Sequence, residues 1–143
     1  MAQHPFRIEQ KEGKDYIFDR VRKKFVFLSP EEWVRQQFLH YLIEVKHFPS
    51  ALISVEKQLK LGQKVRRYDI VVYKQDMPWL LVECKQEQEV LSPAVLQQIL
   101  SYNSLLKVAY LVITNGHEVH CYSVQEAAWS GTVPAWDEVS SQA

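Results

Sequence analysis

Residues 65–85, VRRYDIVVYKQDMPWLLVECK, decide the fold. The stretch holds two runs of branched and aromatic residues, which predict two strands joined by the polar turn at 74–78. Three charged residues interrupt these apolar strands, namely Asp69, Glu83 and Lys85. Charges within buried strands are costly unless they are paired or bind a cation. A functional site is therefore expected at this hairpin.

Helix and strand signals outside the hairpin predict an α/β sandwich with a mixed central sheet. The pairs Ser29-Pro30 and Ser92-Pro93 are typical helix starts, and Glu32 stands where a capping box places its acid. The second helix follows the third strand and permits a parallel crossover to the fourth. The predicted elements are a hairpin at 16–28, helices at 30–47 and 93–107, and strands at 51–59, 65–73, 79–85, 108–114 and 119–124.

The 143 residues predict a single domain, 1–143. Its expected parts are a polar segment at 1–15, a core at 16–124 and a tail at 125–143, in which Trp129 and Trp136 are expected to pack on the body. The stripe of the first helix is predicted to comprise Val34, Phe38, Tyr41, Leu42 and Val45.

Composition excludes several classes of protein. There are only two cysteines, so a disulfide scaffold is not expected and a reducing cytoplasm is predicted. No secretory signal or membrane-spanning run is present, which predicts no membrane association. The net charge is zero, so contact with nucleic acid requires a local basic patch. The absence of a glycine-rich phosphate loop argues against an NTPase.

The chemistry of the hairpin follows from the spacing of its charges. Side chains alternate along a strand, so Glu83 and Lys85 share a face while Cys84 turns to the other. Two nearby carboxylates, Asp69 and Glu83, repel each other, and a hard divalent cation relieves that repulsion. Mg²⁺ prefers one or two carboxylates with water and phosphate oxygens, and a neighbouring lysine can stabilise the attacking water or the developing charge. This set predicts phosphodiester hydrolysis with Mg²⁺, or with Mn²⁺ in its place.

Both predicted helices add polar groups. Gln98 and Tyr102 lie four residues apart on one face of the second helix, beside Val95 and Leu105. They are candidates for orienting the lysine or touching DNA. Glu31, on the first helix, is a candidate third metal ligand.

Each of these patterns has a simpler interpretation. The hairpin charges could form an internal salt bridge, with Arg67 available to Asp69, and the acids of the first helical turn favour the helix dipole. Gln98 and Tyr102 could be ordinary helix residues. The spacing of His117, His120 and Cys121 mimics metal ligands, but side chains on a turn and a strand need not converge, so zinc is not predicted. A basic run could follow a phosphate backbone or protect a strand edge: Lys57, Lys60, Lys64, Arg66 and Arg67.

The ordered set RRYDIVVY, WLLVECK, Gln98-x-x-x-Tyr102 and the upstream PEEWVRQ resembles the PD-(D/E)xK nuclease superfamily. More narrowly, it is similar to the N-terminal nuclease domain of type I restriction enzyme R subunits, over about residues 16–124. Tyr68 stands where the superfamily's proline would precede Asp69. The R subunits continue into a translocase, for which 143 residues leave no room, so a stand-alone relative, a remnant or a piece with separate partners is expected.

The resemblance implies a restriction-endonuclease-like fold and a Mg²⁺-dependent DNA endonuclease linked to type I restriction. It implies restriction-modification subunits as partners, and cutting both strands favours a homodimer. The alternatives are a non-catalytic module of the same fold that binds nucleic acid or a subunit, and a remnant with neither activity. The implied residues are Asp69, Glu83, Lys85, Gln98 and Tyr102 for catalysis, Asp69, Glu83 and Glu31 for metal, and Lys64, Arg66, Arg67 and Arg35 for DNA.

Overall fold

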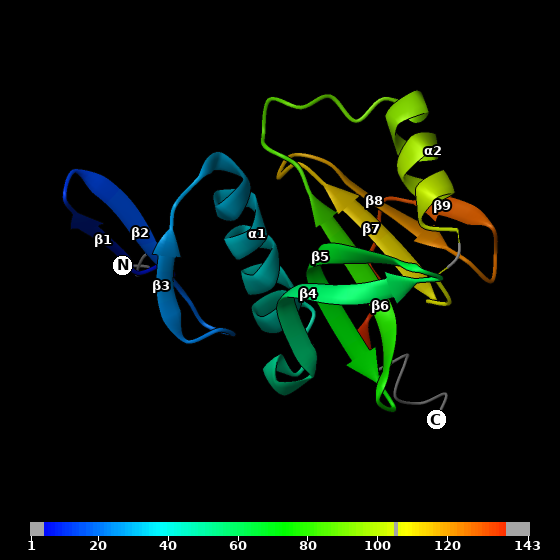
Figure 1. The fold of residues 1–143 in the computed structure, drawn as a ribbon, viewed down its shortest axis with the longest axis horizontal. Coiled ribbons are helices and arrows are strands. Elements are labelled where there is room, and N and C mark those ends of the chain that lie inside the picture. The colour runs from blue at the N-terminus through cyan, green and yellow to red at the C-terminus, as the bar shows by residue number, and fades with distance from the viewer. Residues whose placement is uncertain (1–4, 105, 137–143) are drawn as a thin grey trace.

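The computed structural model describes residues 5–104 and 106–136 and contains two sheets and two main helices (Figure 1). The small sheet has the order β1-β2-β3, and the large one has the order β4-β5-β6-β7-β8-β9. The strands are β1 Ile8–Lys11, β2 Lys14–Asp19, β3 Lys24–Phe27, β4 Ile53–Leu61, β5 Lys64–Lys74, β6 Met77–Cys84, β7 Tyr110–Thr114, β8 Val119–Ser123 and β9 Ala128–Ser130. The helical segments are α1 Pro30–His40, a π-helix Tyr41–Val45, a 3₁₀-helix Ser50–Leu52 and α2 Pro93–Tyr102.

The large sheet is mixed, as predicted. Neighbouring strands pair antiparallel except β6 and β7, which run parallel because α2 carries the chain across the sheet between them. The predicted meander of three strands followed by a crossover is therefore confirmed, and so is the α/β fold class. Among the described helices, none is long and apolar enough to cross a membrane.

The two helices cover opposite faces of the large sheet, because neighbouring residues on a strand point to opposite sides. On β5, Ile70 and Val72 pack toward Val34 and Phe38 of α1, whereas Val71 packs toward α2. Figure 1 shows the small sheet beside α1, away from the large sheet. The inner strands β5 and β6 of the large sheet are thus buried on both faces. This burial explains why their sequences are almost continuously apolar.

Several predicted boundaries were wrong. The first helix was predicted to run to His47, but the α-helix ends at His40 and continues as the π-helix. Val45, predicted to lie in the apolar stripe, is 57% exposed at the end of that turn. The second helix ends at Tyr102 rather than Lys107, because Asn103 donates its side-chain N–H to the carbonyl of Ile99 and caps the helix.

Two strands lie outside the range 16–124 that was predicted for the core. β1 and β9 are short edge strands with mostly exposed side chains, which is why no apolar alternation marks them. The aromatic residues of the tail do pack on the body, as expected: Trp129 contacts Tyr122, and Trp136 contacts Phe48 and Trp79. Leu105 and residues 137–143 lie outside the described residues.

Candidate active site

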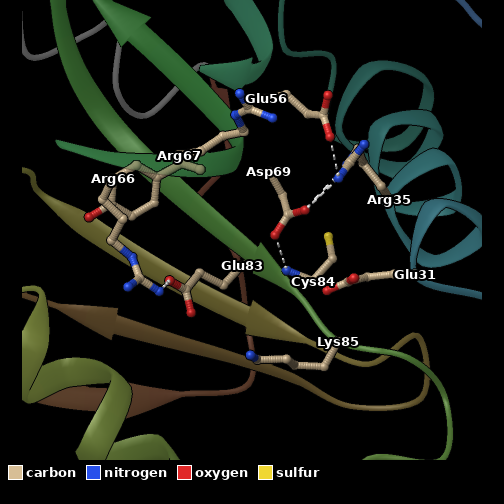
Figure 2. A pocket seen from close by; sticks show the side chains of 10 residues that line it. Glu31, Arg35, Glu56, Arg66, Arg67, Asp69, Glu83, Cys84 and Lys85 are labelled. Carbon is tan, nitrogen blue, oxygen red and sulfur yellow. Dashed lines mark hydrogen bonds and ion pairs between the residues drawn. The ribbon is translucent and has the colours of Figure 1, made fainter. Parts of the chain in front are cut away.

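Asp69 lies where strands β5 and β6 separate. The last pair of their ladder is Ile70 with Val82, and beyond it the backbone N–H of Cys84 donates to Oδ2 of Asp69 (2.8 Å). The Asp69 carboxylate thus takes a hydrogen bond from the neighbouring strand. Its other oxygen, Oδ1, accepts two hydrogen bonds from Arg35, from Nη2 at 2.8 Å and from Nε at 3.3 Å (Figure 2).

Glu83 is held by two donors on its two oxygens. Arg66 Nη2 donates to Oε1 (2.6 Å), and the Tyr102 hydroxyl donates to Oε2 (2.8 Å). The side chain of Glu83 is only 6% exposed, so both contacts compensate for a nearly buried charge. Burial and the nearby Glu83 carboxylate raise the pKa of Tyr102, which keeps its hydroxyl protonated and able to donate.

Lys85 and Glu31 complete the same pocket. The backbone N–H of Lys85 donates to the carbonyl of Thr114 on β7, which fixes the end of β6. No carboxylate in the described residues lies within ion-pair distance of the Lys85 amine. Burial, and then the charge of Asp69, raise the pKa of Glu31. Figure 2 shows Asp69, Glu83, Lys85 and Glu31 lining one cavity, which has a volume of about 230 Å³.

The simpler interpretation of the hairpin charges was an internal salt bridge, with Arg67 available to Asp69. Ion pairs do exist, but Arg67 is exposed, and within the described residues it forms none. Arg35 from α1 pairs with Asp69, and Arg66 pairs with Glu83. Sequence reasoning missed the Arg35 pair because its residues lie on different elements, and the Arg66 pair because its residues lie on different strands.

Arg35 belongs to a network of charged side chains that was not predicted from the sequence. The second guanidinium of the network, Arg22, contacts Asp19 (2.9 Å), Glu32 (3.1 Å) and Glu56 (3.2 Å). Arg35 contacts Glu32 (2.7 Å) and Glu56 (3.3 Å) in addition to Asp69. Four carboxylates therefore share two guanidiniums, which leaves the side of the pocket next to Asp69 short of positive charge.

Glu32 belongs to this network rather than to the predicted capping box. Ser29 caps α1 as predicted by accepting from the backbone N–H of Glu32. The Glu32 carboxylate, however, is drawn to Arg22, Arg35 and Gln36, because two guanidiniums are stronger partners than one backbone amide.

Glu56 is placed by an irregularity of β4. The ladder with β5 pairs Val55 with Ile70 and Lys57 with Tyr68, but it omits Glu56 and Asp69 between them. Glu56 has a φ of 53°, in the left-handed region that residues other than glycine seldom adopt. This backbone turns the carboxylate of Glu56 toward Arg35, and it is the kind of local strain that clusters at functional sites.

The remaining predicted residues divide between the pocket and its surroundings. Arg66 and Arg67 line the pocket, whereas Lys64 is exposed at the turn between β4 and β5. Arg35, predicted for DNA contact, is 7% exposed and lies among carboxylates. Gln98 is exposed on α2 and does not line the pocket, so of the Gln98-x-x-x-Tyr102 pattern only Tyr102 reaches Glu83.

The sequence offers two sets of candidate metal ligands. One is the predicted set at the hairpin, and the other is the zinc-like spacing of His117, His120 and Cys121. In the described part of the chain, no three histidine, cysteine, aspartate or glutamate side chains are grouped to hold a metal ion. Asp69 and Glu83 face guanidiniums instead. Of the zinc-like spacing, His117 contacts Glu87 (3.3 Å) and His120 contacts Glu118 (3.2 Å), while Cys121 is buried.

The fold and the pocket define an α/β domain with a charged pocket where strands β5 and β6 separate, and comparison with known proteins gives its family. The sequence over 30–133 matches the family described as "Type I restriction enzyme R protein N terminus (HSDR_N)", and the chain belongs to this family. No curated protein matches the chain.

Two solved structures share the fold. The fragment structure of a candidate HsdR subunit of a type I restriction enzyme from Vibrio vulnificus YJ016 is similar over 80% of this chain, with 21% identity and a TM-score of 0.58. This chain spans a quarter (25%) of the length of that protein. A crystal structure of a candidate nuclease belonging to DUF820, from Anabaena variabilis ATCC 29413, is similar over 99% of this chain and 88% of its own, with 13% identity and a TM-score of 0.52.

Proposed function

We propose that this chain is a metal-dependent DNA endonuclease domain that hydrolyses phosphodiester bonds as part of type I restriction. The observation that carries the proposal is the convergence of Asp69, Glu83, Lys85 and Glu31 on one pocket at the end of the β5–β6 ladder. Membership of the restriction R family supports it. The action belongs in the cytoplasm, with DNA as substrate and restriction-modification subunits as partners.

The carboxylates of the pocket are of the ligand type that a hard cation prefers, although in the described residues no three of them are grouped around one point. Arg35 is shared among three carboxylates, so it does not fully neutralise Asp69. Burial, and after it the charge of Asp69, raises the pKa of Glu31. Asp69, Glu83 and Glu31 offer the carboxylate oxygens that Mg²⁺ prefers, and Mn²⁺ accepts the same ligands. When bound there, the metal would polarise a water and a phosphate oxygen.

The chain's own residues supply the rest of the proposed chemistry. The amine of Lys85, which has no carboxylate partner among the described residues, would stabilise negative charge on the attacking water and on the phosphate oxygens. Tyr102 holds Glu83 in place through its hydroxyl. Lys64, Arg66 and Arg67, on the strand that leads into the pocket, would contact the phosphate backbone. Cleavage of both strands requires two such pockets, which a homodimer would supply.

Incubation of the purified chain with supercoiled plasmid and Mg²⁺ or Mn²⁺ tests the proposal. We expect nicking that EDTA stops and that Asp69→Asn and Glu83→Gln each abolish. Lys11→Ala, on the exposed strand β1 of the small sheet, is the control for altered surface charge. Nicking of equal strength in Asp69→Asn and wild type would identify the activity as a contaminant.

A second candidate function is a non-catalytic module that binds nucleic acid or a restriction subunit. It is favoured by one observation: both Asp69 and Glu83 already have an arginine partner, with which a metal ion would have to compete. This function predicts DNA or subunit binding that neither EDTA nor Glu83→Gln changes, together with no nicking by any variant.

A further inference from the structure

Arg66 lies between two hollows of the surface. On one side is the acidic pocket, and on the other is a groove of about 550 Å³ formed by the turn between β4 and β5 and the C-terminal end of α2. The side chain of Arg66 is 36% exposed and lines both. Besides Arg66, the groove offers the cation Lys64 and three hydroxyl side chains: Ser101, Tyr102 and Ser104.

The donors of Arg66 are only partly used. Nη2 donates to Glu83 (2.6 Å), and the guanidinium stacks on the ring of Tyr102, with Cζ 3.9 Å from the ring centroid. Nε is buried and has no hydrogen-bond partner among the residues that the structure describes. A guanidinium can donate five hydrogen bonds in a planar fork, a geometry that matches the oxygens of a phosphate. Arg66 therefore has the capacity to bind a phosphate as well as, or in place of, Glu83.

Glu83 cannot bind Arg66 and a metal ion equally well at the same time. Its Oε1 accepts from Arg66 and its Oε2 accepts from Tyr102, so both oxygens are engaged. Two cations close to one carboxylate repel each other, and a metal ion that binds Glu83 must displace or weaken the Arg66 contact. Whatever draws Arg66 away from Glu83 therefore raises the affinity of the pocket for metal.

We propose that Arg66 is a switch that couples phosphate binding in the groove to metal binding at Glu83. Without a ligand, Arg66 neutralises Glu83 and suppresses metal binding. A phosphate of a nucleic-acid strand in the groove takes over the donors of Arg66, and Glu83 is then free to hold the cation. Linkage makes the effect reciprocal, so metal must tighten nucleic-acid binding by the same factor. This inference rests on the proposed metal site.

Calorimetric titration of Mn²⁺ tests the switch in a Lys85→Ala background, which keeps DNA uncut. Four proteins are compared: the background alone and the background with Arg66→Gln, Arg67→Gln or Glu83→Gln. Each is titrated alone, with a short DNA duplex and with inorganic phosphate. Arg67→Gln is the matched control, because Arg67 lines the same pocket but has no ion-pair partner among the described residues.

Without DNA, we expect Arg66→Gln to bind Mn²⁺ about three- to tenfold tighter than the background, and Arg67→Gln to show a smaller change. With DNA added to saturation, so that a weaker DNA affinity of Arg67→Gln does not affect the comparison, DNA tightens Mn²⁺ binding in the background and in Arg67→Gln, but no longer in Arg66→Gln. A similar effect of inorganic phosphate would assign the groove to a single phosphate group, whereas an effect of DNA alone would assign it to a strand. Fluorescence anisotropy of labelled duplex provides the reciprocal measurement.

The outcomes separate the two proposals. Metal affinity that is equal or weaker in Arg66→Gln, or equal gains in Arg66→Gln and Arg67→Gln, overturns the switch while leaving the metal site in place. Binding of Mn²⁺ that Glu83→Gln does not change, or no binding by any protein, overturns the metal site and the switch together. Thermal unfolding of each variant confirms that it is folded.

Discussion

At the scale of single residues, Lys85 differs from Arg35 and Arg66, the two pocket cations that carboxylates hold in place. Arg35 and Arg66 are paired with carboxylates, whereas the amine of Lys85 has no carboxylate partner in the described residues. An amine without a partner is available to a substrate. This distinction separates residues that hold the pocket together from one that can act in it.

Lys85→Ala should therefore impair cleavage without impairing metal binding. We expect the rate of plasmid nicking to fall by about 10²- to 10⁴-fold, the usual contribution of one positioned proton-transfer or charge-stabilising group. Calorimetry with Mn²⁺ should show the wild-type affinity or a higher one. A variant that still nicks at the wild-type rate would remove Lys85 from the chemistry.

Arg35, by contrast, should act on stability. Arg35→Gln leaves the buried Glu32 and the partly buried Asp69 without their shared cation, and breaking such a pair costs about 3 to 5 kcal/mol. Urea unfolding should register this loss in the free energy of unfolding. Arg67→Gln, which removes an exposed arginine, should change it by less than about 0.5 kcal/mol. Equal effects of the two variants would contradict the role of Arg35.

The residues of the pocket were predicted from the sequence much better than their partners. Asp69, Glu83 and Lys85 stand out because charges conflict with an apolar strand. Glu56 does not stand out, since it is an ordinary polar residue within its own element, and Arg35 was assigned to DNA rather than to Asp69. Their role depends on where α1 and the irregular β4 lie relative to Asp69, which only the folded chain determines.

At the scale of elements, α1 carries three of the charged groups that surround Asp69. Glu31, Glu32 and Arg35 all lie within the first turns after the cap at Ser29. The position of these groups therefore depends on how firmly the helix begins.

Ser29→Ala should destabilise the chain by about 1 kcal/mol, because the backbone N–H of Glu32 loses its acceptor. Ser29→Asp should restore most of the loss, since a carboxylate accepts the same hydrogen bond and favours the helix dipole. Chemical unfolding of the three proteins measures the difference. An unchanged free energy in Ser29→Ala would show that the cap contributes nothing.

Helix starts were predictable, but helix ends were not. A Ser-Pro pair is a local signal, and both pairs mark the starts of α1 and α2. The end of α2 depends on Asn103. Its side chain donates a hydrogen bond to the carbonyl of Ile99 and accepts one from the hydroxyl of Tyr68 on β5. A contact between a helix end and a distant strand has no local pattern.

At the scale of the whole molecule, Asp19 of β2 connects the small sheet to α1 through a buried hydrogen bond with Gln36. Its fully buried carboxylate accepts hydrogen bonds from the side chains of Arg22 and Gln36 and from two backbone amides. Burial alone would raise the pKa of Asp19, but these hydrogen bonds and Arg22 together lower it below the ordinary value of 3.8.

Asp19→Asn should cost about 3 kcal/mol at neutral pH, because an amide N–H₂ would face donors in place of a carboxylate oxygen. A lowered folded pKa means that the stabilisation is complete above pH 3.8 and is lost as the pH falls through the lower folded value. The difference in Tm between wild type and Asp19→Asn should therefore narrow below about pH 4. A difference that stays constant down to the lowest accessible pH would contradict this linkage.

The central claim is that Asp69 and Glu83 together hold a divalent cation. Calorimetric titration of Mn²⁺ into wild type, Asp69→Asn and Glu83→Gln tests it most directly. The claim predicts one saturable site in wild type that either substitution removes or weakens at least about tenfold, which corresponds to 1.4 kcal/mol. A site of unchanged affinity in both variants would contradict it.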